Sequence, residues 1–127
     1  MHERHPSGAP ATTVLIVDDD AAFARLAASL LSDRGYRVLG SAATAEEALA
    51  KFTRLRPDAV LIDVRLPDSS GVKLAGELCA GSRPISVLLT STDAGSVTDE
   101  TIRRSGANGF VPKTELTRTD LHRFLRR

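Results

Sequence analysis

Short apolar runs alternate along this chain with longer segments in which apolar and polar residues are mixed. The run at residues 59–62 leads straight into Asp63, and the chain then turns at Pro67. A continuous apolar run with turn residues behind it is typical of a strand buried on both faces, in the middle of a parallel sheet covered by helices. Further strands are predicted at residues 14–17, 36–39, 85–89 and 109–112.

Helices are predicted between these strands, where apolar residues recur every three or four positions. Thr44 with Glu47, and Thr117 with Asp120, have the spacing of a capping box at the start of a helix. Residues 94–105 have a weaker helical pattern that ends at Gly106. The inward-facing side chains expected on the other helices are Phe23, Leu26, Ala27, Leu30, Leu31, Ala48, Leu49, Phe52, Leu55, Val72, Ala75, Leu78, Cys79, Leu121, Phe124 and Leu125.

Strand and helix alternate five times, which implies a parallel sheet with helices on both faces. We therefore predict an α/β fold over residues 13–127, a five-stranded, doubly wound (βα)5 domain. Residues 1–12 mix charged residues with Pro, Ser and Gly, and they lack the apolar run of a signal peptide. We expect them to be a disordered N-terminal lead-in.

Composition narrows the classes of function. A chain of 127 residues that is 42% hydrophobic and 26% charged is typical of one soluble domain. The net charge of +1 argues against direct nucleic-acid binding by this domain, and no apolar stretch is long enough to cross a membrane. The one cysteine, Cys79, is expected to be a small buried residue, and without a partner for a disulfide it fits a cytoplasmic protein.

Chemically useful residues follow four of the five predicted strands. These are Asp18–Asp20, Asp63, Thr90 and Lys113. The carboxyl ends of parallel strands meet at one edge of a sheet, so we expect these side chains to converge there. Carboxylates in one pocket repel each other unless a cation lies among them, and hard oxygen ligands without His or Cys suit Mg²⁺.

The same pocket would suit a phosphoryl group. The ammonium group of Lys113 and the hydroxyl of Thr90 are donors for phosphoryl oxygens that do not contact a metal ion. A carboxylate can act as a nucleophile and form an aspartyl phosphate. Asp63 is the candidate nucleophile because it is single and follows the central strand.

Each of these residues also has an ordinary structural role open to it. One of the three aspartates at 18–20 can cap the helix that follows, and a cap is the alternative role for Asp63 too, although the next helix is expected to begin several residues later, near Ser70. A threonine in a strand is common, and a lone lysine is usually a solvated charge. The functional interpretation depends on the complete set, in which each residue type follows its own strand.

The motifs around these residues resemble the receiver domains of two-component response regulators, the CheY-like receiver family. The segments that carry the resemblance are Val17–Asp19, Asp63–Gly71, Leu88–Ser91 and Gly109–Lys113, and the likeness runs from residue 13 to residue 127. It implies a flavodoxin-like receiver fold and a signalling role in phosphorelay. A sensor histidine kinase or a histidine phosphotransfer protein would be the phosphoryl donor.

The resemblance also implies roles for individual residues. Asp63 would accept the phosphoryl group, and Mg²⁺ would be bound by Asp63, by Asp19 directly, by Asp18 through water and by the backbone carbonyl of Arg65. Lys113 would pair with the phosphate. In the same family Thr90 would move to hydrogen-bond the phosphate and Phe110 would turn inward, which would change the surface of the fourth helix, fifth strand and fifth helix.

The sequence departs from the family pattern in two places. The aromatic switch position is Phe110 and not tyrosine, so a packing switch remains but a hydroxyl contact does not. Lys113 is followed by Thr114 where many receivers have proline, and the proline here is Pro112. At the rim of the pocket we expect Arg65, Ser91 and Thr92, and we predict that the bulky Arg65 shields the phosphoryl group from water.

Several alternatives stay open at this stage. The chain fits a stand-alone receiver that acts on a downstream protein, or a receiver joined covalently to a DNA-binding output domain, with or without phosphorylation-dependent homodimerisation. A Mg²⁺-dependent phosphohydrolase would need a second aspartate where Arg65 stands, so only self-phosphorylation and self-dephosphorylation are expected. A receiver-like interaction module that works without phosphorylation is the other alternative. The basic surface near the C-terminus is interpreted as a solvated face in preference to a binding site for an acidic partner, and it comprises Arg103, Arg104, Arg118, Arg123, Arg126 and Arg127.

Overall fold

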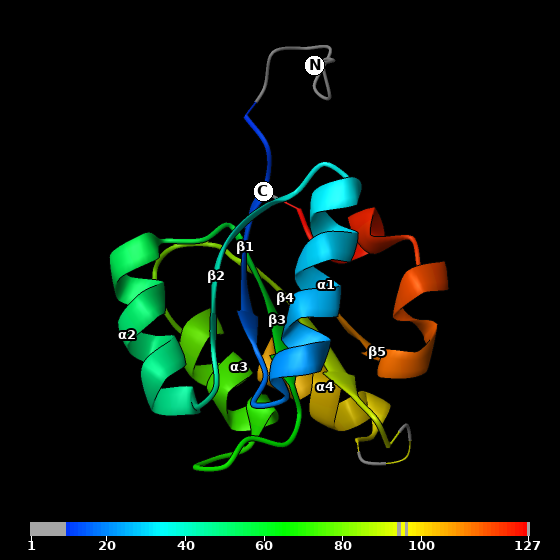
Figure 1. Cartoon of the computed structure of the whole chain (residues 1–127). Helices are drawn as coiled ribbons and strands as arrows, with labels where there is room; N and C mark the ends of the chain where they lie inside the picture. Colours follow the sequence, from blue (N-terminus) through cyan, green and yellow to red (C-terminus); the bar gives the residue numbers. More distant parts are fainter. Residues whose placement is uncertain (1–9, 94, 96, 127) are drawn as a thin grey trace.

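The computed structural model describes residues 10–93, 95 and 97–126 (Figure 1). Strands and helices alternate along the chain up to β5, and two short 3-10 helices follow. The elements are β1 Thr13–Val17, α1 Ala21–Asp33, β2 Arg37–Ala42, α2 Ala45–Leu55, β3 Ala59–Asp63, α3 Gly71–Cys79, β4 Ser86–Ser91, α4 Asp99–Ser105, β5 Gly109–Pro112, η2 Lys113–Arg118 and η3 Leu121–Arg123.

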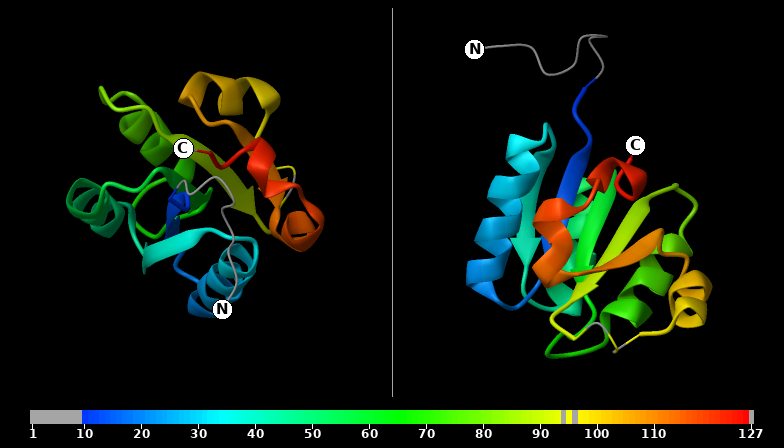
Figure 2. Two further views of the ribbon diagram at one scale, coloured as in Figure 1. Left: turned by 90° about the horizontal axis from the view of Figure 1, so that it is seen from above. Right: turned by 90° about the vertical axis from the view of Figure 1, so that its right-hand side faces the viewer.

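The five strands form one parallel sheet in the order β2-β1-β3-β4-β5. Helix α1 and the two 3-10 helices cover one face, and α2, α3 and α4 cover the other (Figures 1 and 2). The predicted doubly wound α/β architecture is therefore confirmed, with a flavodoxin-like topology. Every strand points toward the same end of the molecule, which is the lower end in Figure 1.

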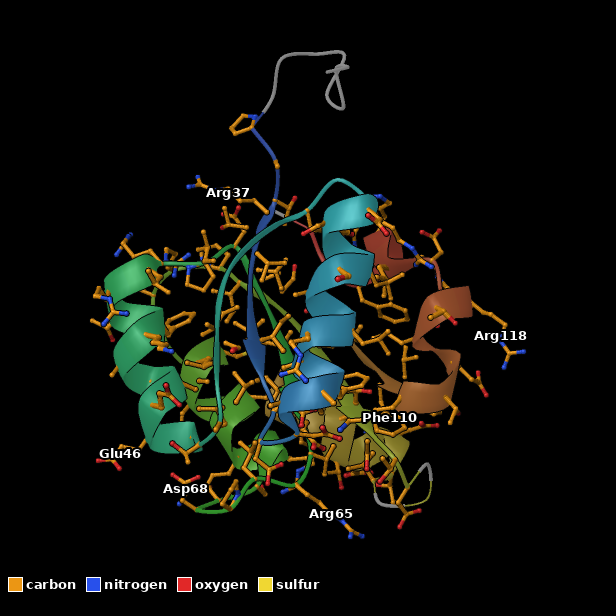
Figure 3. The ribbon with its side chains drawn as sticks, in the orientation of Figure 1. Arg37, Glu46, Arg65, Asp68, Phe110 and Arg118 are labelled. Carbon is orange, nitrogen blue, oxygen red and sulfur yellow. The ribbon has the colours of Figure 1, made fainter. Side chains whose placement is uncertain are left out.

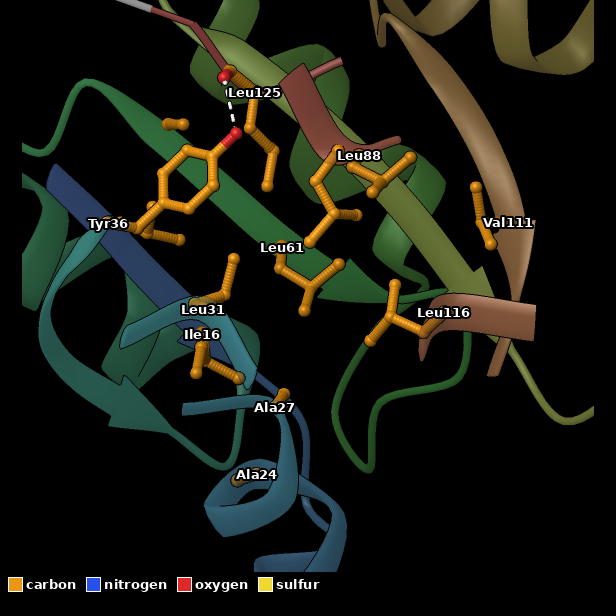
Figure 4. Close-up of a cluster of buried hydrophobic side chains, with 13 residues drawn as sticks. Ile16, Ala24, Ala27, Leu31, Tyr36, Leu61, Leu88, Val111, Leu116 and Leu125 are labelled. Carbon is orange, nitrogen blue, oxygen red and sulfur yellow. Dashed lines mark hydrogen bonds between the residues drawn. The ribbon is translucent and has the colours of Figure 1, made fainter. Parts of the chain in front are cut away.

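The two faces of the sheet have separate apolar cores. Side chains alternate between the faces of a strand, so Ile16 and Leu61 pack under α1 while Leu15 and Ile62 pack under α2 and α3. Figure 4 shows the first of these cores, which the C-terminal residues Leu116 and Leu125 close. All five residues of β3 are buried, as expected for a central strand.

Side-chain caps start the helices. The predicted capping box at α2 is present: the Glu47 N–H donates to Thr44 Oγ1 at 3.0 Å, and the Ala43 N–H donates to Glu47 Oε1 at 2.8 Å. Helix α4 ends at Gly106, whose φ of 86° lies in the left-handed region that glycine adopts easily. These caps fix where α2 begins and where α4 ends.

The predicted C-terminal helix is wrong. Residues 113–118 and 121–123 form two 3-10 helices separated by two extended residues, Thr119 and Asp120. The guanidinium of Arg34 donates to the carbonyl of Thr119 at 2.6 Å and also to the carbonyl of Thr117, so those oxygens are taken by a distant side chain. The predicted apolar face is nevertheless buried, with Leu121 2% exposed. Asp120 caps the second 3-10 helix and Thr117 does not act as a cap.

Other expectations need smaller corrections. Helix α4 begins at Asp99, after the Thr98 cap, which is later in the chain than its pattern suggests, while β2 extends to Ala42. Leu26 is 58% exposed and Leu49 39% exposed, because α1 and α2 bury narrower stripes than the apolar pattern suggests. Cys79 is half-buried, and this burial raises the pKa of its thiol.

Three expectations fall partly on residues outside the described part of the chain. These residues are 1–9 of the predicted lead-in, 94 and 96 of the predicted fourth helix, and Arg127 of the basic surface. Across residues 10–93, 95 and 97–126, we find no helix with the length and apolar character needed to span a membrane.

Candidate functional site

The residues predicted to converge do so at the carboxyl edge of the sheet. Asp18 follows β1, Asp63 ends β3, Thr90 lies in β4 and Lys113 follows β5. Asp63 and Thr90 are direct partners in the register of β3 with β4. The loop that carries Arg65 borders this edge, where Figure 3 labels its side chain.

Three carboxylates form the centre of the site. Asp18, Asp19 and Asp63 each place one oxygen within 4.8 Å of the others. Asp18 and Asp63 are buried and Asp19 is exposed, so the cluster opens to solvent on one side. Three oxygen ligands with an open side fit Mg²⁺, which binds through a few carboxylates and keeps several water ligands. Asp20 has a different role, because its carboxylate caps α1 by accepting from Ala22 N–H at 3.0 Å.

Backbone amides orient the two buried carboxylates. Asp18 Oδ1 accepts from the Asp20 N–H at 2.8 Å, and Asp63 Oδ1 accepts from the Arg65 N–H at 3.2 Å. In each carboxylate this leaves Oδ2 turned toward Lys113. The Arg65 peptide therefore lies directly beside the Asp63 carboxylate.

Lys113 lies between these two oxygens. Its Nζ is 2.8 Å from Asp18 Oδ2 and 3.3 Å from Asp63 Oδ2, and the lysine side chain is only 10% exposed. Burial lowers the pKa of Lys113, but the interactions with Asp18 and Asp63 outweigh that effect and raise it, so the ammonium form persists. Burial also raises the pKa of Asp18, although its contact with Lys113 and its bond from Asp20 N–H oppose the change.

Thr90 contributes a buried hydroxyl without a partner. Its side chain is fully buried, and Oγ1 makes no hydrogen bond to any of the described residues. Its backbone carbonyl accepts from the Val64 N–H at 2.8 Å, which ties β4 to the end of β3 beside Asp63. A buried polar group without a partner costs free energy, and this arrangement suits a hydroxyl whose partner arrives with a ligand.

The loop between β3 and α3 is held by two residues whose importance sequence reasoning missed. A β-carbon at Gly71 would lie 2.1 Å from the carbonyl oxygen of Asp63, so only glycine fits there. Asp68 reaches α2, where it accepts from the Ala45 N–H at 2.8 Å and the Glu46 N–H at 3.0 Å, and these bonds lower its pKa. Both residues belong to the motif that follows Asp63, which was the available signal.

The rim of the pocket is built from two loops. Arg65 Nη2 lies 3.4 Å from Asp93 Oδ2, and both side chains are exposed. Thr92 is exposed beside them. Ser91, which was expected at the rim, is buried, and its hydroxyl accepts from the Asp93 N–H at 3.1 Å, so it shapes the second loop from inside.

Phe110 lies on the other side of β4 from Asp63. It is half-buried, packs in the core under α3 and α4, and is a register partner of Leu89 in β4. It lines a groove of about 410 Å³ together with Val97, Ile102 and Ala107. The residue next to it, Val111, pairs with Thr90. Phe110 is thus one strand position away from the unpartnered hydroxyl.

A further residue of the site was assigned to the core alone by its helical spacing. Phe23 of α1 places its ring under Lys113, with Nζ 4.3 Å from the ring centroid. The spacing of Phe23 in α1 gives no indication of this contact, because the lysine comes from the opposite end of the chain.

Comparisons with known proteins identify the family of the chain. Residues 14–126 match the family described as response regulator receiver domain. A protein-glutamate methylesterase/protein-glutamine glutaminase of Nocardioides sp. is 33% identical over 107 residues, which cover 82% of this chain and 29% of that protein. The chemotaxis protein CheY of Thermotoga maritima is 28% identical over 100 residues, which cover 79% of this chain and 83% of CheY.

Solved structures show the same relationship. A CheY-like response regulator receiver domain protein from Methanospirillum hungatei JF-1 superimposes with a TM-score of 0.75 at 28% identity, covering 85% of this chain and 86% of that one. The chain spans less than a third of the length of the first curated relatives that it matches, with shares of 29%, 26% and 31%.

Proposed function

The chain belongs to the response regulator receiver domain family, and we propose that it signals by accepting a phosphoryl group on Asp63 in a Mg²⁺-dependent reaction. The observation that carries this proposal is the position of the Lys113 ammonium, 2.8 Å from Asp18 Oδ2 and 3.3 Å from Asp63 Oδ2, beside the three-carboxylate cluster. This is a site with one anionic nucleophile, one cation and room for a divalent metal ion.

The residues divide the work of phosphoryl transfer. Asp63 Oδ2 attacks the phosphorus of the donor, a new P–O bond forms, and the P–N bond to a donor histidine or the P–O bond to an acyl phosphate breaks with its electron pair leaving on the donor. Lys113 pairs with a phosphoryl oxygen. Mg²⁺, when bound by Asp18, Asp19, Asp63 and the Arg65 carbonyl, would neutralise charge on the other oxygens.

The proposed switch starts at Thr90. The phosphoryl group of an acyl phosphate carries about one and a half to two negative charges in place of the single charge of the Asp63 carboxylate, beside a hydroxyl that has no partner among the described residues. Movement of Thr90 toward that group vacates space next to β5, and Phe110 is placed to respond. The output surface then consists of α4, β5 and the C-terminal 3-10 helices, which stand where a fifth helix was expected.

We propose a histidine kinase or a histidine phosphotransfer protein as donor and a protein target or a linked output domain as receiver of the signal, in the cytoplasm. Two of the matched relatives are much longer than this chain, which supports keeping a linked output domain in the proposal. The domain would turn over nothing except its own acyl phosphate. Among the basic side chains on the output face, Arg103 Nη2 lies 3.5 Å from Glu100 Oε1, and both side chains are exposed. This exposed ion pair supports a solvated face there.

The proposal is tested by intact mass after incubation with acetyl phosphate, with and without Mg²⁺. We expect one phosphoryl adduct that requires Mg²⁺ and disappears in Asp63→Ala. Asp19→Asn should raise the Mg²⁺ concentration needed, whereas Asp20→Asn, which keeps the cap of α1, should not. If no adduct forms under any condition, the chain is a receiver-like interaction module that works without phosphorylation.

A further inference from the structure

Phe23 and Lys113 form a contact that the phosphoryl-transfer roles do not use. The Lys113 Nζ lies 4.3 Å from the centroid of the Phe23 ring, a distance typical of a cation–π interaction. Phe23 is hydrogen-bonded to the same acidic run that supplies two carboxylates of the cluster: Asp20 Oδ1 accepts from the Phe23 N–H at 3.2 Å. The backbone of Phe23 is therefore held beside the acidic run.

Within the described part of the chain, three groups contact the ammonium of Lys113. Two are the carboxylates of Asp18 and Asp63, and the third is the face of the Phe23 ring. The two carboxylates are also proposed metal ligands. When they share their charge with a divalent cation, they attract the ammonium less. The negative face of the ring is not a metal ligand, so its attraction for the ammonium persists.

We propose that Phe23 is a positioning residue that keeps the Lys113 ammonium at the pocket in the metal-loaded state. The inference rests on the proposed function, because the proposed partner of the Lys113 ammonium is an oxygen of the phosphoryl group. Phe23 also packs against the core formed by α1 and the sheet, so a purely structural role is the competing explanation. The two explanations predict different results for ring and non-ring replacements.

The variants separate ring chemistry from bulk. Phe23→Leu keeps an apolar side chain but removes the ring, and Phe23→Tyr keeps the ring. Phe52→Leu is a matched control, because Phe52 is also half-buried and also faces a cation, with the Arg83 guanidinium 5.1 Å from its centroid. Its place on α2 leaves the pocket untouched.

The first readout is affinity for beryllofluoride, a mimic of the phosphoryl group, at saturating Mg²⁺. We expect Phe23→Leu to weaken it about three- to tenfold, the range of a partly desolvated cation–π contact, while the affinity for Mg²⁺ alone changes less than about twofold. Phe23→Tyr should restore wild-type affinity, and Phe52→Leu should retain it. Equal beryllofluoride affinity in Phe23→Leu and the wild type would overturn the inference.

The second readout follows the lysine itself and needs only the wild-type protein. The chain has three lysines, Lys51, Lys73 and Lys113, so NMR of ¹³Cε-labelled lysine gives three signals. The protons next to the Lys113 ammonium should be shifted upfield by the ring and should stay shifted when Mg²⁺ is added. If adding Mg²⁺ moves them to the positions of the other two lysines, the ring does not hold Lys113 and the inference is wrong.

Failure of the two proposals can be told apart. A wild-type protein that binds no beryllofluoride with Mg²⁺ contradicts the proposed function and this inference together. A wild-type protein that binds it, with Phe23→Leu unchanged, contradicts the inference alone. Should Phe23→Leu fail to fold, the behaviour of the wild-type lysine signal on adding Mg²⁺ decides the matter.

Discussion

Asp63 and Thr90 are neighbours across the β3–β4 pair, and the hydroxyl of Thr90 is buried there without a hydrogen bond to any described residue. The Val64 N–H, which donates to the Thr90 carbonyl at 2.8 Å, holds the two strand ends together. The resting protein therefore carries an unsatisfied polar group beside its proposed phosphoacceptor. A phosphoryl oxygen on Asp63 would supply the missing partner.

Thr90→Val should stabilise the resting protein and impair its response. Valine has the same branched shape and replaces the unpaired hydroxyl by a methyl group, so we expect about 1 kcal/mol of added unfolding free energy in urea without Mg²⁺. Beryllofluoride should bind more weakly. Ser91→Ala is the control, because the Ser91 hydroxyl accepts a bond from the Asp93 N–H and its loss should destabilise. A Thr90→Val variant that is less stable than the wild type would show that the hydroxyl is already bonded.

Gly71→Ala should distort the phosphoacceptor itself. The added β-carbon would lie 2.1 Å from the Asp63 carbonyl oxygen and 2.9 Å from Ile62 Cγ2, so the end of β3 must move. We expect a loss of roughly 1–3 kcal/mol in unfolding free energy and slower phosphorylation by acetyl phosphate.

Gly76→Ala is the matched control in the same helix. Its nearest neighbour would be the Ser105 carbonyl oxygen at 4.0 Å, so alanine fits and should stabilise by about 0.5–1 kcal/mol. Equal effects of the two substitutions would mean that the close approach at residue 71 does not constrain Asp63.

Asp68 should make the free energy of unfolding depend on pH in the acidic range. Its hydrogen bonds from the Ala45 and Glu46 N–H groups lower its pKa in the folded protein. A depressed carboxyl pKa contributes stability that is present above the unfolded value of about 4 and is lost as the pH falls through the folded pKa. Asp68→Asn should therefore be less stable than the wild type at pH 6, and the difference should shrink at pH 3. A difference in urea midpoint that is the same at both pH values would contradict this.

Arg65 should lengthen the lifetime of the phosphorylated state. Its pairing with Asp93 at 3.4 Å connects the two loops at the rim, so the side chain can limit access of water to the acyl phosphate. We expect Arg65→Asn to shorten the lifetime measured after removal of acetyl phosphate, and Asp93→Ala to shorten it less because the arginine remains. An unchanged lifetime in Arg65→Asn would show that the side chain does not shield the phosphoryl group.

The site was predictable because of a property of parallel sheets. Asp18, Asp63, Thr90 and Lys113 come from four different strands, and the rule that carboxyl ends coincide was enough to bring them together. Four of the five helices were likewise recognisable from local spacing and caps, although the fourth begins later than its pattern suggests. Such features depend on residues close together in sequence.

The features that could not be predicted depend on distant contacts. The guanidinium of Arg34 donates hydrogen bonds to backbone carbonyls more than 80 residues away in the sequence, and those carbonyls are then not available to a regular C-terminal helix. The local apolar spacing of Leu121 and Leu125 nevertheless favours such a helix. The ring of Phe23 meets Lys113 only in the folded chain, and the need for glycine at residue 71 follows from the path of another strand. No local sequence pattern predicts these contacts between residues that are far apart in the sequence.

The central claim is that Asp63 forms the acyl phosphate, and it is tested most directly by locating the adduct. Borohydride reduction of the phosphorylated protein converts an aspartyl phosphate to homoserine, which peptide mass spectrometry assigns to one position. We predict homoserine at residue 63 and unmodified aspartates at residues 18, 19 and 20, which the sequence places after β1. Homoserine at any of those three positions, with Asp63 unchanged, would contradict the account.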